Sequence, residues 1–290
     1  MTWIFDPLAR SDPMSINSDY LRLIDRLAAA LPAAQITGLH LPALVEDGVY
    51  RDEFGFVFLE DGSVGPFYVS LDPVLRTLWT RYPRPDLARL DPLATARRLG
   101  VGDLAERALA LGAFNALSQR LMRSAGYGPP DRRESKEVPA GRSQGPVGMV
   151  GYFSPVVDRL VDSGNEVLVL ELQPQRVPER PQVRVTTRPD DLSRCQQVLC
   201  TASVLINDTL DDLLVACRGT VFELIGPTGS GLPDALFDRG IGNVGGIVFD
   251  DPEELRKVLA RGDPWGSAGR KYQIQPEDYP GVEVLIARCR

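Results

Sequence analysis

The sequence predicts an α/β protein in which a smaller α+β unit, residues 1–126, precedes a parallel, doubly wound sheet in residues 148–290. Three observations carry this prediction. In the second half, apolar strand-like runs alternate with helical patterns, which is typical of a parallel sheet with helices on both faces. In the first half, strand candidates come before most of the helices, as in an α+β unit. The segment 127–147 between them is polar and rich in proline and glycine, which predicts an exposed linker.

The smaller unit is predicted to open with an amphipathic helix over residues 18–31, because Asn17 or Ser18 can cap it and Pro32 follows it. Two later strands flank the turn-forming segment "DGSV" and predict a hairpin. A long helical pattern then has Asp103 placed to cap it and Gly126 placed to end it. The expected strands and later helices are residues 35–41, 54–60 and 65–71, followed by 72–79 and 101–126.

The second unit is predicted from its alternation. Ser154, Pro155 and Gly164 mark one helix, with Ser154 expected at its N-cap. Asp251 and Pro252 open another helix. The run "EVLVLEL" is apolar throughout, as expected for a strand covered on both faces. The expected strands are residues 145–153, 166–172, 195–206, 220–227 and 241–250, with an edge strand at 281–289; the expected helices are residues 154–164, 208–219, 232–240 and 251–262.

Composition argues against several partners. The chain carries 32 Lys and Arg against 39 Asp and Glu, a formal net charge of −7, which disfavours nucleic acid and anionic membrane surfaces. No apolar run approaches the length that spans a bilayer, and the first residues lack the apolar core of a signal peptide. These features predict a cytoplasmic protein. They leave the oligomeric state open, with a homo-oligomer among the alternatives.

The cysteines do not suggest a metal site. Cys195, Cys200, Cys217 and Cys289 form no C-x-x-C pair, and His40 is the only histidine. We therefore interpret the cysteines as reduced, mostly buried thiols and expect no zinc, while a soft-metal site stays as the alternative. With a single histidine, any Ser–His or Cys–His catalysis would depend on His40 alone.

A ligand site is expected at the carboxyl ends of the parallel strands, where open α/β sheets bind their ligands. The residues that follow the predicted strands are polar and glycine-rich, unlike the strands themselves. They are Gly151, Tyr152, Phe153 and Ser154; Glu171 and Gln173; Thr201, Ser203, Asn207, Asp208 and Thr209; and Gly226, Pro227, Thr228, Gly229 and Ser230.

Two familiar phosphate motifs are absent from these loops. The glycines around Gly151 do not form the G-x-G-x-x-G pattern of dinucleotide-binding domains. The loop "GPTGSGLP" has the glycine spacing of an NTPase loop, but Leu232 and Pro233 stand where Lys and Ser or Thr are required. Backbone N–H groups of residues 226–230 cradling a polar or anionic group stay as an alternative. Ser154 has helix capping as its simpler role, and Glu171 can be a solvent-facing acid as well as a ligand for hydroxyl groups.

The junction "INDTLDD" poses one further choice. Either Asp208 or Thr209 suffices to cap the helix that follows, which makes Asn207 surplus to capping. The amide of Asn207 either bonds the local backbone or faces a ligand, and the pattern alone does not decide.

Three stretches carry a resemblance to a known family. They are "VGMVGYFSPVVDRLVDSGNEVLVLELQP", "TASVLINDTLDDLLVACRG" and "VFELIGPTGSGLPDALFDRGIGNVGGIVFDDPEELRKVLARG". Together they resemble the putative heavy-metal chelation family, and the "ALGAFNALS" helix and the hairpin add a weaker match. The resemblance implies a Rossmann-like domain preceded by a smaller domain similar to the N-terminal domain of enolase. The loop "GPTGSG" is richer in glycine than the family's common Gly-Pro-Ser type.

The resemblance also implies a ligand site between the two domains. It implies condensation or hydrolysis in pterin, flavin or siderophore-type metabolism, or heavy-metal chelation, and it names no cofactor. On this interpretation Asn207 and Thr209 hydrogen-bond a small polar or heterocyclic ligand, Tyr152 or Phe153 stacks on it, and Glu171 acts as a base. Asn115 either reaches the cleft or is bonded internally. The alternatives are a non-catalytic protein that handles a metal or metal chelate, and a scaffold without chemistry.

Overall fold

The computed structural model describes residues 15–45, 47, 49–131 and 145–290. The expectations for the first residues, and most of the predicted linker 127–147, lie outside the described residues.

The smaller unit contains a three-stranded antiparallel sheet with helices packed against it. Strand β1 (Ile36–His40) pairs with β2 (Phe54–Leu59), and β2 forms the expected hairpin with β3 (Val64–Tyr68). The α+β prediction for this unit is confirmed. Its helices are α1 (Ile16–Ala30), α2 (Val74–Arg81), α3 (Pro92–Arg97) and α4 (Leu104–Ser124).

The start of α1 differs from the prediction. Ser15 is the N-cap, and its Oγ accepts from the backbone N–H of Ser18 at 3.3 Å. The proposal of Asn17 or Ser18 as the cap was wrong because both are already helical. Asn17 uses its side-chain amide in a contact with the second unit. The cap of α4 is confirmed, since Asp103 forms a capping box with Glu106.

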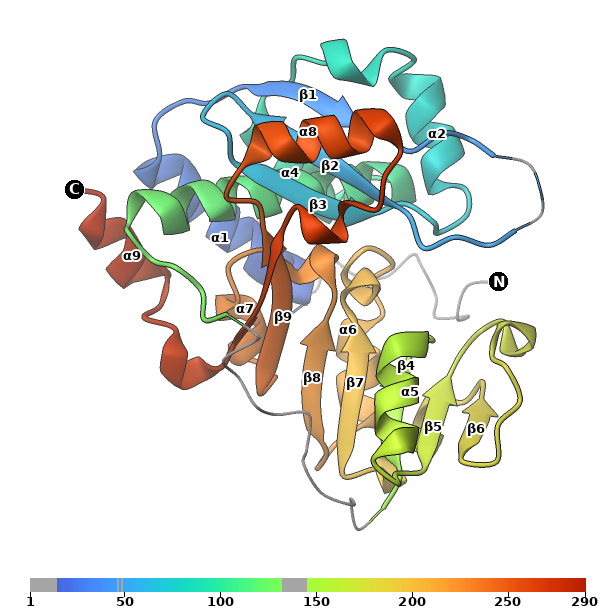
Figure 1. Cartoon of the computed structure of the whole chain (residues 1–290). Coiled ribbons are helices and arrows are strands. Elements are labelled where there is room, and N and C mark those ends of the chain that lie inside the picture. The colour runs from blue at the N-terminus through green and yellow to red at the C-terminus, as the bar shows by residue number, and fades with distance from the viewer. Residues whose placement is uncertain (1–14, 46, 48, 132–144) are drawn as a thin grey trace.

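The second unit is a seven-stranded sheet in the order β10-β9-β8-β7-β4-β5-β6, and all its strand pairs are parallel except β9–β10 (Figure 1). This confirms the predicted α/β class. The strands are β4 (Val147–Val150), β5 (Val167–Leu170), β6 (Val183–Thr186), β7 (Gln197–Thr201), β8 (Val221–Ile225), β9 (Asn243–Val248) and β10 (Arg270–Ile274). The helices are α5 (Ser154–Asp162), α6 (Leu210–Ala216), α7 (Asp234–Phe237), α8 (Pro252–Arg261) and α9 (Val282–Arg288).

Helices cover both faces of the parallel sheet. Met149 and Val169 belong to the apolar cluster that contains Val157 and Leu160 of α5. Neighbouring residues on the same strands, such as Leu170, belong instead to a larger cluster that contains residues of α6 and α7. This alternation follows from the period of two residues along a strand.

Three element predictions in this unit were wrong. The tail 281–289 is the helix α9, because Val282, Leu285 and Ile286 are buried at helical spacing. The apolar run 195–206 stops being a strand at Thr201, whose Oγ1 accepts from the N–H of Ser203 and starts a short 3₁₀ helix, η5 (Ala202–Leu205). The edge strands β6 and β10 were missed because their exposure weakens the apolar pattern.

Ser154 was also predicted incorrectly. It is the first residue of α5, Phe153 occupies the N-cap position, and the Ser154 hydroxyl donates to Asp158 Oδ2 at 3.2 Å.

The two units share one hydrophobic core. The largest apolar cluster runs from α1 and α4 to the strands and helices of the parallel sheet. Helix α4 is mostly buried and approaches β3 closely. A Cβ atom on Gly65 would lie 1.9 Å from the carbonyl oxygen of Gly112, so only glycine permits this packing. The arrangement places the antiparallel sheet above the carboxyl ends of the parallel strands (Figure 1).

Candidate functional site

The topological switch point of the parallel sheet lies between β4 and β7, because the chain runs from β4 through β5 to β6 on one side and through β7, β8 and β9 on the other. Gly151 follows β4 with a φ of 78°, and Thr201 ends β7. A Cβ atom on Gly151 would lie 3.3 Å from Cγ2 of Thr201. The Thr201 and Ser203 hydroxyls are 2.9 Å apart. Two hydroxyls therefore lie beside the half-buried Gly151, whose N–H donates to the carbonyl of Leu170 at 3.0 Å, at the point where such sheets bind ligands.

Tyr152 and Phe153 extend this part of the site. Both are half-buried, and both pack against the cluster around α5. The Tyr152 hydroxyl is buried and has no hydrogen-bond partner among the described residues. Buried hydroxyls are nearly always paired with protein, water or ligand, so this hydroxyl is available to bind a ligand.

Glu171 follows β5 and is half-buried. Its Oε1 accepts from the backbone N–H of Gln173 at 3.0 Å, so the carboxylate orders its own turn. Arg176, three residues after Gln173, places its guanidinium 3.7 Å from the ring centroid of Tyr50 in the smaller unit. This cation–π contact joins the carboxyl edge of the parallel sheet to the segment that leads into β2.

Aromatic side chains gather where β2 and β3 meet the segment after α8. Phe54 packs edge-on against Tyr68, with ring centroids 5.4 Å apart, and against Trp265, at 5.2 Å. The hydroxyls of Tyr68 and Tyr50 both donate to Asp52 Oδ1, at 2.8 and 3.0 Å. Burial raises the pKa of Tyr50 to about 12 and that of Tyr68 further, so both phenols are neutral at pH 7.

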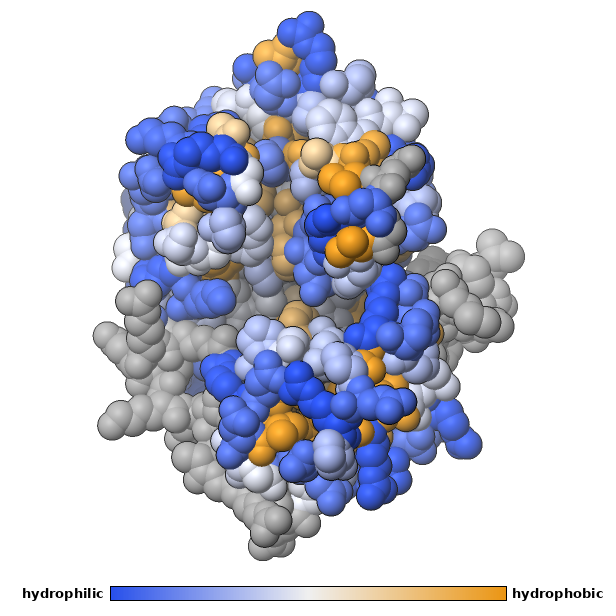
Figure 2. Space-filling view, turned by 45° about the vertical axis from the view of Figure 1, so that its right-hand side comes forward, coloured by the Kyte–Doolittle hydropathy of each residue, from blue (hydrophilic) through white to orange (hydrophobic). Residues whose placement is uncertain are grey.

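This aromatic group was not predicted, although the sequence contains a signal for it. Tyr50, Asp52 and Phe54 alternate along the chain and therefore share one face of a strand and its extension. His40 lies in β1 with its ring 6.0 Å from that of Phe56, and burial lowers its pKa. Figure 2 shows that the surface is hollowed near the middle of the molecule, between its upper and lower parts.

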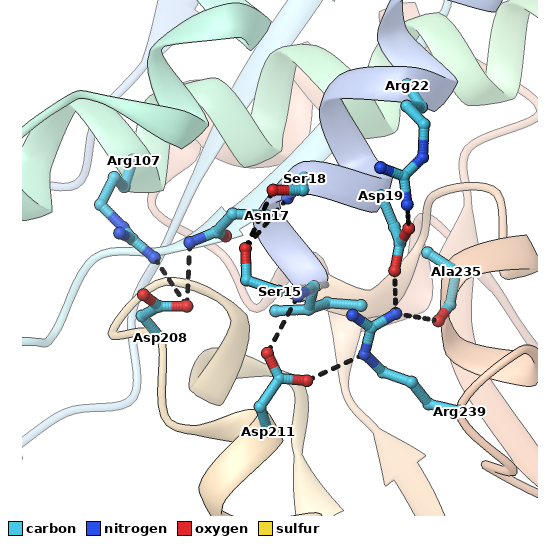
Figure 3. A network of polar contacts seen from close by, with 11 residues as sticks. Ser15, Asn17, Ser18, Asp19, Arg22, Arg107, Asp208, Asp211, Ala235 and Arg239 are labelled. Atoms are coloured by element: carbon cyan, nitrogen blue, oxygen red, sulfur yellow. Dashed lines mark hydrogen bonds and ion pairs between the residues drawn. The ribbon is translucent and has the colours of Figure 1, made fainter. Parts of the chain in front are cut away.

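The turn after η5 contains Asn207, Asp208 and Thr209, and its contacts are with α1, α4 and its own residues. Asp208 has a φ of 61° and accepts from Asn17 Nδ2 at 2.8 Å, and Arg107 of α4 lies 3.7 Å from the same carboxylate (Figure 3). Asn207 Oδ1 accepts from the Thr209 hydroxyl at 2.7 Å. Thr209 holds the N-cap position of α6 but makes no side-chain cap bond. The turn therefore docks on α1 and α4.

A second carboxylate extends the docking contact. Asp211 Oδ2 accepts from the backbone N–H of Ile16, and its Oδ1 accepts from Nε of Arg239 at 2.8 Å. Arg239 also pairs with Asp19 (Figure 3). This network connects the first turn of α1 to α6 and to the chain after α7. It gives Asp208 and Asp211 a structural role between the units.

Asn115 is likewise bonded internally. It is 1% exposed, and its Nδ2 donates to the carbonyls of Pro66 at 2.8 Å and Thr228 at 2.9 Å. It thereby connects β3 to the glycine-rich loop after β8. Within that loop, the N–H groups of Gly229 and Ser230 are used in turns that close on Gly226 and Pro227. Two of the N–H groups expected to cradle a ligand are thus already engaged.

The four cysteines are free thiols, and burial raises the pKa of Cys217 to about 12. Within the part of the chain that the structure describes, no group of three or more His, Cys, Asp or Glu side chains is arranged to hold a metal ion. In the same part, no helix is both long and apolar enough to cross a bilayer.

Comparisons with known proteins agree with the fold. The model of the putative heavy-metal chelation family matches residues 139–275, which confirms the resemblance seen in the sequence. Two solved structures of proteins of unknown function from that family are similar over nearly the whole chain. The one from Pyrococcus horikoshii has 18% identity, a TM-score of 0.65, and covers 90% of this chain and 99% of its own. The one from Desulfitobacterium hafniense has 18% identity, a TM-score of 0.62, and covers 89% and 98%. No curated protein matches the chain.

Proposed function

We propose, from the match of residues 139–275 to the putative heavy-metal chelation family, that this chain binds a small, flat, polar molecule between its two units. The observation that carries the proposal is the group at the switch point, where the Thr201 and Ser203 hydroxyls lie beside Gly151. Such a group recognises the ring nitrogens, carbonyls and hydroxyls of a heterocycle by hydrogen bonding.

The aromatic group around Phe54 supports a flat ligand. Phe54 and Trp265 are half-buried aromatic side chains that offer ring faces and edges for stacking. The unpaired hydroxyl of Tyr152 adds one more hydrogen-bonding group beside Gly151. Heterocycles of the pterin, flavin or siderophore type combine a flat conjugated ring with polar edges. Such molecules match a site that offers aromatic rings for stacking and hydroxyls for hydrogen bonding.

If the chain is an enzyme, Glu171 is the candidate base. It is half-buried just after β5, and β5 neighbours β4, which Gly151 follows. Its bond to the N–H of Gln173 holds the carboxylate in position, and the second carboxylate oxygen is the one that would take a proton. The free thiols of the four cysteines support a cytoplasmic location for this activity.

A second candidate is a non-catalytic protein that handles a metal chelate. Arg176 favours it, because its exposed guanidinium lies over Tyr50 beside the strand ends and would attract an anionic complex.

Ligand titrations followed by tryptophan fluorescence test the proposal, with riboflavin, a pterin and a ferric catecholate complex as probes. Thr201→Val keeps the shape of the side chain and removes its hydroxyl. It should weaken binding of whichever probe binds by roughly 1–3 kcal/mol. Thr220→Val is the matched control, because Thr220 lies just before β8, at its amino end, and bonds the carbonyl of Cys217. Binding that is unchanged in Thr201→Val, or weakened equally in both variants, would exclude a ligand at the switch point.

A further inference from the structure

Three oxygen atoms meet where the segment before β2 passes the end of β3. Asp52 Oδ1 lies 2.8 Å from Tyr68 Oη and 3.0 Å from Tyr50 Oη, and the two phenol oxygens also contact each other. Each oxygen is thus within hydrogen-bond distance of the other two. The three form a triangle made of two phenols and one carboxylate.

The local sequence explains why they meet. Phe54 is paired with Tyr68 in the hairpin, and the strand alternation continues backwards from Phe54 to Asp52 and Tyr50. The hydroxyl of Ser70 accepts from the N–H of Glu53 and donates to the carbonyl of Arg51, which ties the two chain segments together beyond the strands.

Two further contacts orient the phenol rings. Tyr68 is 9% exposed and packs edge-on against Phe54. The Tyr50 ring is held under the guanidinium of Arg176. All three oxygens of the triangle come from the smaller unit, and the parallel-sheet unit contributes Arg176 against the Tyr50 ring. The triangle opens to solvent on the side of Tyr50 and Asp52, which are exposed.

We propose that Tyr50, Asp52 and Tyr68 form a binding site for a hard, highly charged metal ion of the ferric class. Ligand oxygens about 2.0 Å from an octahedral ion lie about 2.8 Å from their neighbours, which is close to the 2.8 and 3.0 Å that separate Asp52 Oδ1 from the two phenol oxygens. Phenolate and carboxylate oxygens are hard donors and suit such an ion better than they suit copper or zinc. Three ligands on one face leave the opposite face open.

Charge supports the same assignment. Two phenolates and one carboxylate balance three positive charges, and the two phenol protons leave to solvent when the ion binds. Arg176 then adds a positive charge beside the site, where it would hold an anionic co-ligand on the open face. The assignment does not rest on the proposed heterocycle site.

The test is a titration of the whole chain with ferric nitrilotriacetate, followed by visible absorption. Binding should produce a phenolate-to-iron charge-transfer band that saturates at one equivalent. Tyr68→Phe and Tyr50→Phe should each weaken binding by at least about 100-fold, because loss of a ligand costs more than loss of a supporting group. Tyr82→Phe, at the end of α2 and half-buried, is the matched control and should keep the band.

Asp52→Asn provides a variant that is safe for folding, because Asp52 is exposed. It should keep the melting temperature of the parent and still lose affinity at least about tenfold. Absence of the band in the parent chain, or a band that survives equally in all four variants, would overturn the assignment. Zinc bound as tightly as iron at the same residues would also overturn it. The titration contains none of the heterocyclic probes, so its failure is separate from failure of the Thr201→Val experiment.

Discussion

Replacement of Asp208 by alanine should destabilise the protein, because it removes the carboxylate that joins the parallel-sheet unit to α1 and α4. Asn17 is 8% exposed, and the Arg107 side chain is 15% exposed. Both lose their contact with that carboxylate in the variant. Asp208 itself also has a φ of 61°, a conformation that alanine adopts less readily than aspartate.

The size of the effect follows from three contributions. The hydrogen bond from Asn17 to a charged acceptor contributes about 1.5–3 kcal/mol. Loss of one partner from a fully buried ion pair costs about 3–5 kcal/mol. The ion pair of Asp208 with Arg107 is longer, at 3.7 Å, and the Asp208 side chain is 26% exposed. We therefore count about 1 kcal/mol for its loss. The positive φ at position 208 adds roughly a few tenths of a kcal/mol. We expect a loss of about 3 kcal/mol in the free energy of unfolding, or roughly 6–12 °C in Tm.

Asn207→Ala is the matched control from the same turn. Asn207 is half-buried, and its side-chain oxygen accepts from the Thr209 hydroxyl two residues away. We expect a loss below about 1 kcal/mol. Urea unfolding of the two variants and the parent measures both values. If Asp208→Ala loses less free energy of unfolding than Asn207→Ala, Asp208 does not hold the parallel-sheet unit on α1 and α4. The prediction that Asn207 binds the ligand is refuted if Asn207→Ala binds the fluorescence probes as the parent does.

Three further predictions concern packing and pH. Asn115→Ala should cost about 2 kcal/mol in urea unfolding because two buried carbonyls lose their donor, whereas Ser118→Ala, equally buried but bonded within its own helix, should cost less than about 1 kcal/mol. Gly65→Ala should cost at least about 3 kcal/mol, because its Cβ would overlap the backbone of α4; unchanged unfolding would contradict the close packing. The hydrogen bond from Arg81 lowers the pKa of Asp103 from 3.8 to about 2, so its contribution is present above about pH 4 and is lost as pH falls towards 2. Asp103→Ala should therefore cost about 1 kcal/mol at pH 7 and almost nothing near pH 2, and a cost independent of pH would contradict this sign.

Local patterns were sufficient to predict the architecture. The alternation of strands and helices, the "DGSV" hairpin and the Asp103 cap each depend on residues close together in the sequence, and all are found in the structure. The errors fell where local signals were weak or ambiguous. Residues 281–289 contain β-branched residues but bury them at helical spacing, and the edge strands β6 and β10 carry too few buried residues for a clear pattern.

The placement of the strand-end residues depended on the tertiary structure. Gly151, Thr201 and Ser203 meet as the topology of a parallel sheet predicts. Asn207 and Asp208 leave the same strand end, yet a four-residue 3₁₀ helix, η5, separates them from it, and Asp208 faces α1 and α4.

The sequence by itself determined the elements and the order in which they follow one another, because helix and strand periods depend on neighbouring residues. Only the tertiary structure decided which polar groups bind each other and which remain available. Asp208 meets Asn17 across 191 positions, and Asn115 meets Thr228 across 113. Tyr50 and Tyr68 meet through the hairpin register, and Arg176 of the other unit lies over the Tyr50 ring. Such contacts arise where the surfaces of two folded units meet. The helix and strand periods of the sequence do not predict them, because those periods depend only on neighbouring residues.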